Sequence, residues 1–290
     1  MSLVSLLLVI AAAITHASWN LIAKRAAQVG PAFVFAYGVC ATVLYAPWVA
    51  WIVLHEGMTW TPAVVACILL SGLLHLGYSL CLQRGYQVAD LSVVYPIARG
   101  TGPLLSTIGA FVLLGEPPRT AGIAGMLCVV AGVLLIATQG RLEIFRQPHA
   151  WIGVRWGMAI GVLIAMYTVV DAYGVKVLAI MPVVFDWFTC LTRSVLMLPH
   201  MATRRAQSWE AMRGYWRLAW AVGALSPLGY ILVLYALRNG APLSLVAPAR
   251  EMSMMLGTLA GMILLREKVG PGRLAGCLAI VAGVVLLGSA

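Results

Sequence analysis

The stretch "VVYPIARGTGPLL" at residues 93–105 places Arg99 inside a long apolar run. A near copy, "LVAPAREMSMML" at residues 245–256, places Arg250 in the matching position. Each arginine follows a proline, which removes a backbone hydrogen bond and bends a helix. An intramembrane charge costs at least ~2.5–3.5 kcal/mol on insertion scales. Two such arginines therefore indicate a requirement of structure or function.

The composition predicts a membrane protein. The 290 residues are 62% hydrophobic and 10% charged, whereas a soluble domain carries about 25% charged residues. A membrane-spanning helix needs about 20 apolar residues. We therefore predict an all-α integral membrane protein in the plasma (bacterial inner) membrane. Its ten transmembrane helices are expected at 3–23, 31–54, 63–83, 91–114, 120–138, 152–174, 182–200, 217–237, 243–265 and 271–289.

The two arginine-containing stretches belong to a longer internal repeat. The tripeptide at 76–78 recurs at 228–230, 152 residues later, and Arg99 aligns with Arg250 after a one-residue shift. The chain is thus predicted to hold two five-helix units, at 1–146 and 147–290. Because five is odd, the second unit enters the membrane from the opposite side. Inverted repeats are typical of transporters whose substrate site lies near the midplane.

Three stretches, two of which include those quoted above, carry a family resemblance: "ITHASWNLIAKR" (14–25), "ADLSVVYPIARGTGPLLSTIGAFVLLGE" (89–116) and "LSLVAPAREMSMMLGTLAGMILLREK" (243–268). They resemble the EamA-like members of the drug/metabolite transporter superfamily over essentially the whole chain. The resemblance implies a ten-helix, 5+5 inverted-repeat fold. It also implies secondary transport, commonly export of amino acids or related small metabolites, without naming a substrate.

Polar residues inside the apolar segments are the candidate functional groups, because such residues are costly there. Arginine's planar fork of donors matches a carboxylate in two-point contact. We predict substrate binding by Arg99, Arg250, Trp19, Asn20, Tyr78, Tyr95, Tyr167 and Tyr230. We predict ion or proton coupling through Asp171, Glu251, His16 and His75.

Each of these residues also has a structural interpretation. Arg99 either contacts substrate or pairs with Asp171 or Glu251 in a buried bridge. Both histidines either relay protons or hydrogen-bond to neighbouring helices. In segment 182–200, Asp186 and Arg193 are interpreted as structural or snorkelling residues.

The sequence favours a secondary transporter of a small polar metabolite, such as an amino acid or related carboxylate. The alternative is efflux of lipophilic cations, bound by Asp171 and Glu251. An enzyme is not expected, because HExxH, GxSxG and metal-ligand spacings are missing from the sequence. No cofactor or metal is predicted, and without a P-loop ATP is not the direct energy source.

Charge and glycine patterns suggest partners and orientation. The net charge of +10 sits in short loops beside apolar segments, so nucleic acid is not an expected partner. Loops after odd-numbered segments hold thirteen lysines and arginines against three in the other loops, which predicts both termini outside the cytoplasm. Glycines in segments 120–138 and 271–289 predict close helix packing within the chain, or alternatively a homodimer.

Overall fold

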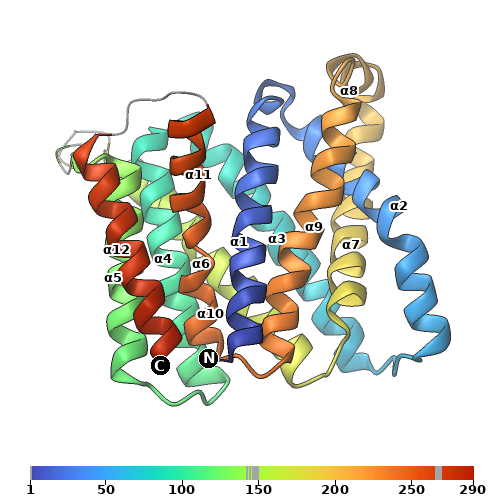
Figure 1. The fold of residues 1–290 in the computed structure, drawn as a ribbon. Coiled ribbons are helices and arrows are strands. Elements are labelled where there is room, and N and C mark those ends of the chain that lie inside the picture. The colour runs from blue at the N-terminus through green and yellow to red at the C-terminus, as the bar shows by residue number, and fades with distance from the viewer. Residues whose placement is uncertain (1, 142, 144, 146–149, 265–269) are drawn as a thin grey trace.

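The computed structural model describes the chain except residues 1, 142, 144, 146–149 and 265–269 (Figure 1). The described part is all-helical, without strands. The predicted boundary between units at 146 and 147 lies outside the described residues. The helices are α1 (Leu3–Lys24), α2 (Pro31–His55), α3 (Pro62–Val88), α4 (Leu91–Leu113), α5 (Thr120–Thr138), α6 (Ala150–Lys176), α7 (Pro182–Thr203), α8 (Arg205–Ala211), α9 (Trp216–Arg238), α10 (Leu243–Ala249), α11 (Met252–Leu264) and α12 (Pro271–Ser289), with a 3₁₀ turn η1 (Ala27–Val29).

Local sequence signals set many of the helix starts. Prolines open α2, α3, α7 and α12, since the first helical position needs no N–H donor. The side chain of Thr61 caps α3 and that of Asp90 caps α4 by accepting a backbone N–H. These caps fix where the chain enters the bundle.

The segment 243–265, predicted as one helix bent at Pro248, is instead interrupted, so the expected bend is a break. Helix α10 ends at Ala249, and α11 begins at Met252. Pro248 cannot donate a backbone hydrogen bond. The turn that follows is closed by short-range bonds, with the N–H of Glu251 donating to the Pro248 carbonyl at 3.0 Å. Arg250 therefore lies at a helix break. Its repeat counterpart Arg99 lies inside α4, which continues through Pro96.

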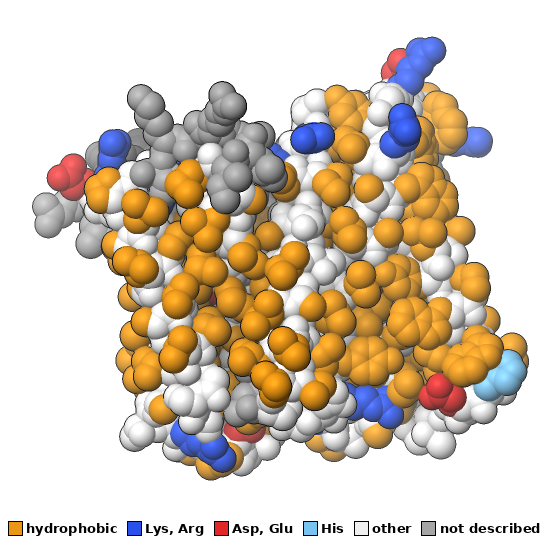
Figure 2. Space-filling view, in the orientation of Figure 1, with side chains coloured by type: hydrophobic (Ala, Val, Ile, Leu, Met, Phe, Trp, Pro, Cys, Tyr) orange, Lys and Arg blue, Asp and Glu red, His pale blue; other side chains and the backbone are white. Residues whose placement is uncertain are grey.

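Seven of the described helices are long and apolar enough to cross a membrane. They are α1, α2, α3, α5, α6, α9 and α12. Helices α10 and α11, of 7 and 13 residues, are each shorter than the about 20 residues that a crossing needs. The chain is thus a multi-pass membrane protein. The surface agrees with this, because hydrophobic side chains cover the middle of the face in Figure 2, and many basic ones lie toward its two ends.

The helices run side by side, and the two termini lie at the same end of the bundle (Figure 1). Helix α4 packs along α6, α1 along α9 and α5 along α12. Each of these pairs joins a helix from the first half of the chain to one from the second half. The two halves therefore interlock instead of forming separate bodies.

Helices α5 and α12 touch through their backbones. A Cβ added at Gly132 would lie 2.7 Å from the carbonyl oxygen of Gly276, and one at Gly283 would lie 2.7 Å from that of Gly125. Only glycine permits an approach this close. These four glycines are used inside the chain. A homodimer through the same two helices stays a prediction, and it would have to use their outer faces.

Candidate functional site

A cavity of about 580 Å³ lies between the two halves of the chain. Its lining comes from α1, α2, α3, α4, α6, α7, α9 and the break after α10. It includes Gly30 and Pro31 at the α1–α2 connection and the exposed side chain of Gln87 near the end of α3. The cavity therefore reaches the surface at the end of the bundle opposite the two termini.

Arg250 lines this cavity and is 6% exposed. Across the part of the chain that the structure describes, its guanidinium forms no ion pair and no hydrogen bond. Glu251, its neighbour in sequence, acts on the Arg250 charge from nearby, but its ion pair is with Arg99. An arginine in a cavity without an acidic partner keeps its five donors available for an anion.

Arg99 has the opposite arrangement. One of its terminal nitrogens lies 2.8 Å from the Glu251 carboxylate and 3.5 Å from the Ser253 hydroxyl. Glu251 is 1% exposed, whereas Arg99 lines the cavity. Of the two partners left open for Arg99, the structure places Glu251 there, across the interface between α4 and the α10–α11 break.

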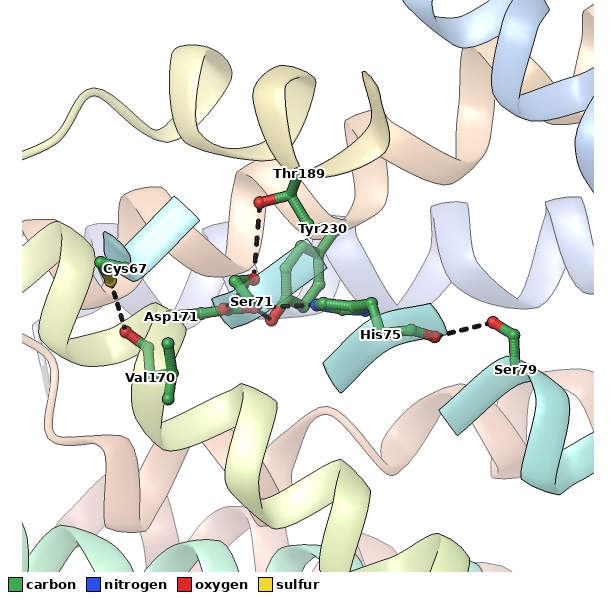
Figure 3. A network of polar contacts seen from close by, with 8 residues as sticks. All are labelled: Cys67, Ser71, His75, Ser79, Val170, Asp171, Thr189 and Tyr230. Carbon is green, nitrogen blue, oxygen red and sulfur yellow. Dashed lines mark hydrogen bonds and ion pairs between the residues drawn. The ribbon is translucent and has the colours of Figure 1, made fainter. Parts of the chain in front are cut away.

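Asp171 lies behind the cavity wall at the centre of a polar network (Figure 3). Its carboxylate accepts hydrogen bonds from Ser71 at 2.5 Å, from His75 at 3.0 Å and from the hydroxyl of Tyr230. Thr189 donates to the Ser71 hydroxyl at 3.4 Å. Asp171 is fully buried, so this network joins α6 to α3, α9 and α7 around one carboxylate.

His75 connects that network to the cavity. It contacts Asp171 and also lines the cavity. Its ring stacks on Tyr167 with centroids 4.0 Å apart, and Tyr230 approaches the ring edge-on at 5.6 Å. Tyr78 packs edge-on against Tyr167 at 5.7 Å. Aromatic rings therefore surround the histidine on the cavity side.

Helix α1 contributes a second polar face to the cavity. His16 and Trp19 are in edge-on contact at 4.9 Å, and Asn20 donates to the His16 carbonyl at 2.9 Å. The indole N–H of Trp19 is buried and finds no hydrogen-bond partner among the described residues. It is a further donor available to a ligand.

At the opposite end of the bundle, Glu116 in the α4–α5 connection joins the two halves. Its carboxylate accepts hydrogen bonds from the backbone N–H groups of Leu243 at 2.6 Å and Ser244 at 2.9 Å, and from the Ser244 hydroxyl at 2.7 Å. Lys176, at the end of α6, pairs with it at 2.9 Å. We call this set the Glu116 clamp. It ties the first half of the chain to the start of α10.

A family model of EamA-like transporters matches residues 3–138 and again 151–289. The chain belongs to the EamA-like transporter family. It is therefore a membrane transporter, and the resemblance noted in the sequence is confirmed.

Two further similarities accompany the EamA match. This EamA-family chain is 35% identical over 85 residues to the multidrug resistance protein EbrB of Bacillus subtilis (strain 168), covering 29% of this chain and 68% of that protein. A protein of known crystal structure matches it with a TM-score of 0.76 at 19% identity, over 98% of each chain. At that identity the structural match supports the fold alone.

The predicted site residues of this EamA-family chain lie in two places: most line the cavity, and two lie behind its lining. The eight predicted substrate-binding residues, and also His16 and His75, line the cavity. The acids Asp171 and Glu251 do not line the cavity. Asp171 binds His75 and Glu251 binds Arg99, and both of these partners line it. Among the described residues, no cluster of histidines, cysteines and acids could hold a metal ion.

Helix α7 also borders the cavity, which the sequence did not indicate. Asp186 and Arg193, interpreted from the sequence as structural or snorkelling residues, line it. With Thr189 and Cys190 they occupy one helical face at i, i+3, i+4 and i+7. That spacing was visible in the sequence, but which neighbour the face meets was not.

Proposed function

We propose that this EamA-family chain is a secondary active exporter of a small polar metabolite with a carboxylate or related anionic group, such as an amino acid. The observation that carries the proposal is Arg250, a cavity-lining arginine at a helix break without an acidic partner among the described residues. A buried cation without an ion-pair partner is costly. A bound carboxylate offsets that cost through charge-assisted, two-point hydrogen bonding.

The rest of the cavity supports an anionic ligand. Three arginines line it, Arg99, Arg193 and Arg250, against the single lining carboxylate of Asp186. Asp171 is already occupied by three donors, and Glu251 faces Arg99. Neither acid is free to receive a cationic substrate in this arrangement.

Ten spans in two inverted units form the second part of the proposal. It treats α10 and α11 together as one span and adds α4 and α7 to the seven apolar helices. Helix contacts that recur in the two units support it. Helix α3 packs on α6, and its counterpart α9 packs on α1, the counterpart of α6. In the same way, α4 packs on α6, and its counterpart α11 packs on α1. Pairings that repeat after five spans are expected of two similar halves related by a pseudo-two-fold axis.

Alternating access follows from the cavity and the Glu116 clamp. The cavity reaches one end of the bundle, while the clamp joins the two halves at the other end. Rocking of one half against the other would close the first end and open the second. We place the cavity opening on the cytoplasmic side of a bacterial inner membrane, because that end carries most of the loop lysines and arginines.

Proton coupling through His75 and Asp171 completes the mechanism. His75 lines the cavity and binds the buried carboxylate, so a proton can pass between solvent and Asp171 by way of the imidazole. Neutralising Asp171 weakens its bonds to Ser71 and His75 on α3, and these bonds cross between the two halves. His16 and Glu251 remain further candidates for this role.

Ligand-induced thermal stabilisation of the purified protein tests the proposal. A ligand that binds the folded state raises the melting temperature as its concentration exceeds its dissociation constant. Amino acids and organic acids should stabilise the wild type and lose this effect in Arg250→Gln. Arg213→Gln, an exposed arginine in a 3.4 Å pair with Glu210, should respond like the wild type. Equal stabilisation of Arg250→Gln and wild type by every anion would refute the role of Arg250.

Lipophilic-cation efflux is the second candidate. The similarity to a protein named for multidrug resistance favours it, and Asp186 offers a lining carboxylate. In that case cations, and not anions, would stabilise the protein, and Arg250→Gln would respond like the wild type.

A further inference from the structure

Helix α7 presents a charged face to the cavity that the proposed function does not yet use. Asp186 and Arg193 mark the two ends of this face, separated by about 10 Å along the helix axis at 1.5 Å per residue. Thr189 and Cys190 lie between them, and all four residues line the cavity. The face is therefore long enough to touch a part of the substrate distant from Arg250.

Arg193 lacks an acidic partner. No carboxylate of a described residue lies within ion-pair distance of its guanidinium. Its Nε is buried without a hydrogen-bond partner in the described part of the chain. Cys190, Tyr37 and the Asp186 carboxylate, seven residues earlier on α7, all act on its charge. Because Asp186 forms no ion pair with Arg193, it balances the positive charge only in part.

Arg193 and Arg250 belong to the same electrostatic environment. Both lie close enough to His75 to act on its charge, and both line the one cavity. Two like charges that share a poorly solvated space repel each other. Among the described residues, neither arginine is in an ion pair with an acid, so the cost of holding both is offset when a ligand brings negative charge to each.

We infer that Arg193 is a second anion-binding position, and that the preferred substrate carries two acidic groups, one held by Arg250 and the other by Arg193. This rests on the proposed role of Arg250 and narrows the substrate class from an anion to a dianion, such as a dicarboxylate. The cavity volume of about 580 Å³ lies within the range of small-molecule sites. Arg99, already balanced by Glu251, is not one of the two positions.

The test compares dicarboxylates with their half-amides, which keep the shape and remove one charge. The full-length purified protein is titrated with the unbranched C3 to C6 dicarboxylates and with each half-amide, and the melting temperature is recorded. One charge-assisted contact should make the best diacid effective at a concentration at least about tenfold lower than its half-amide. In Arg193→Gln this advantage should vanish while the half-amide response persists. Arg213→Gln should behave as the wild type.

The outcomes separate this inference from the proposed function. If a half-amide matches its diacid in the wild type, or if Arg193→Gln keeps the diacid advantage, the second position does not exist, and the role of Arg250 stands on its own test. If amino acids stabilise best and Asp186→Asn removes that effect, α7 binds an amine and the dianion is refuted. Should Arg193→Gln fail to fold, Arg193→Lys keeps the charge without the planar fork and should retain part of the diacid preference.

Discussion

A terminal nitrogen of Arg99 lies 2.8 Å from the Glu251 carboxylate, so the two repeat-related arginines differ in charge balance. Arg99 is compensated across the interface between halves, and Arg250 has no acidic partner among the described residues. The two copies of the arginine thus have different surroundings in one cavity. Arg99 pairs across the interface between the halves, and Arg250 is the one for which we propose a ligand.

We predict that Arg99→Gln and Glu251→Gln each lower the free energy of unfolding by about 3–5 kcal/mol, because each leaves one buried charge without its partner. The double variant should lose less than the sum, since neither charge then remains. Thermal unfolding of the four proteins measures the coupling. Additive losses would mean that the two side chains do not interact.

The Glu116 clamp gives a pH-dependent prediction. Burial alone would raise the pKa of Glu116, but hydrogen bonds from Ser244, Lys176 and Leu243 outweigh it and hold the pKa below its ordinary value. A carboxyl with a lowered folded-state pKa contributes stability above its ordinary pKa and loses it as the pH falls through the lowered value.

Glu116→Gln should therefore lower stability by about 1–3 kcal/mol near pH 7, and the difference from wild type should shrink below about pH 4. Unfolding measured across pH 3 to 8 checks this. The matched control is Glu210→Gln, in the exposed pair with Arg213, which should cost at most about 1 kcal/mol. A wild-type advantage that is constant over the whole range would argue against the clamp.

The glycine contact between α5 and α12 makes a steric prediction. Gly276→Ala would place a methyl group 2.7 Å from the backbone oxygen of Gly132, so we expect a loss of about 1–3 kcal/mol from overpacking. Gly288→Ala, on the same helix, meets nothing within 4 Å and should be neutral or slightly stabilising. Melting temperatures of the two variants should rank in this order; the reverse order would show that the helices are not in backbone contact.

Proton coupling predicts a specific transport defect. Asp171→Asn keeps the size of the side chain and removes its titration, so accumulation of substrate driven by a pH gradient should fall to the level without a gradient. Substrate exchange at equal concentrations should continue, because it moves no net proton. Asp90→Asn, at the exposed start of α4, serves as the control. If gradient-driven accumulation persists in Asp171→Asn, a group other than Asp171 couples transport to the proton gradient.

Orientation is checked by a reporter fused after Ala290. The excess of basic loops predicts that this end lies outside the cytoplasm, so a reporter that works only outside should be active. Activity of a cytoplasm-only reporter at the same position would reverse the orientation. It would also move the cavity opening to the outer face.

Much of the helical frame was predictable, because apolar run length and proline positions are local properties. The split at Arg250 was not. Pro96 and Pro248 occupy equivalent positions, yet only the second ends a helix. A proline by itself thus does not decide whether a helix bends or breaks. The contacts around Arg99 and Arg250 differ, and these contacts are not visible in the sequence.

Which residues form the candidate site was predictable from the sequence. Which of them pair with each other was less predictable. Spacing alone brought His16, Trp19 and Asn20 to one face. It could not say whether Arg99 meets Asp171 or Glu251, because that depends on how helices from the two halves meet. The position of Arg193 at the cavity could not be predicted for the same reason: a charge near a helix end looks alike in sequence whether its face meets solvent or a cavity.

The backbone contact between α5 and α12 bears on which helices can carry the proposed transport motion. Gly125 and Gly132 pack directly on the backbone of Gly283 and Gly276, so we expect these two helices to stay together as the axis about which the halves turn. Spin labels placed on α5 and α12 should keep a constant separation while substrate is turned over. Labels on α2 and α7, at the far side of the cavity, should report the full amplitude.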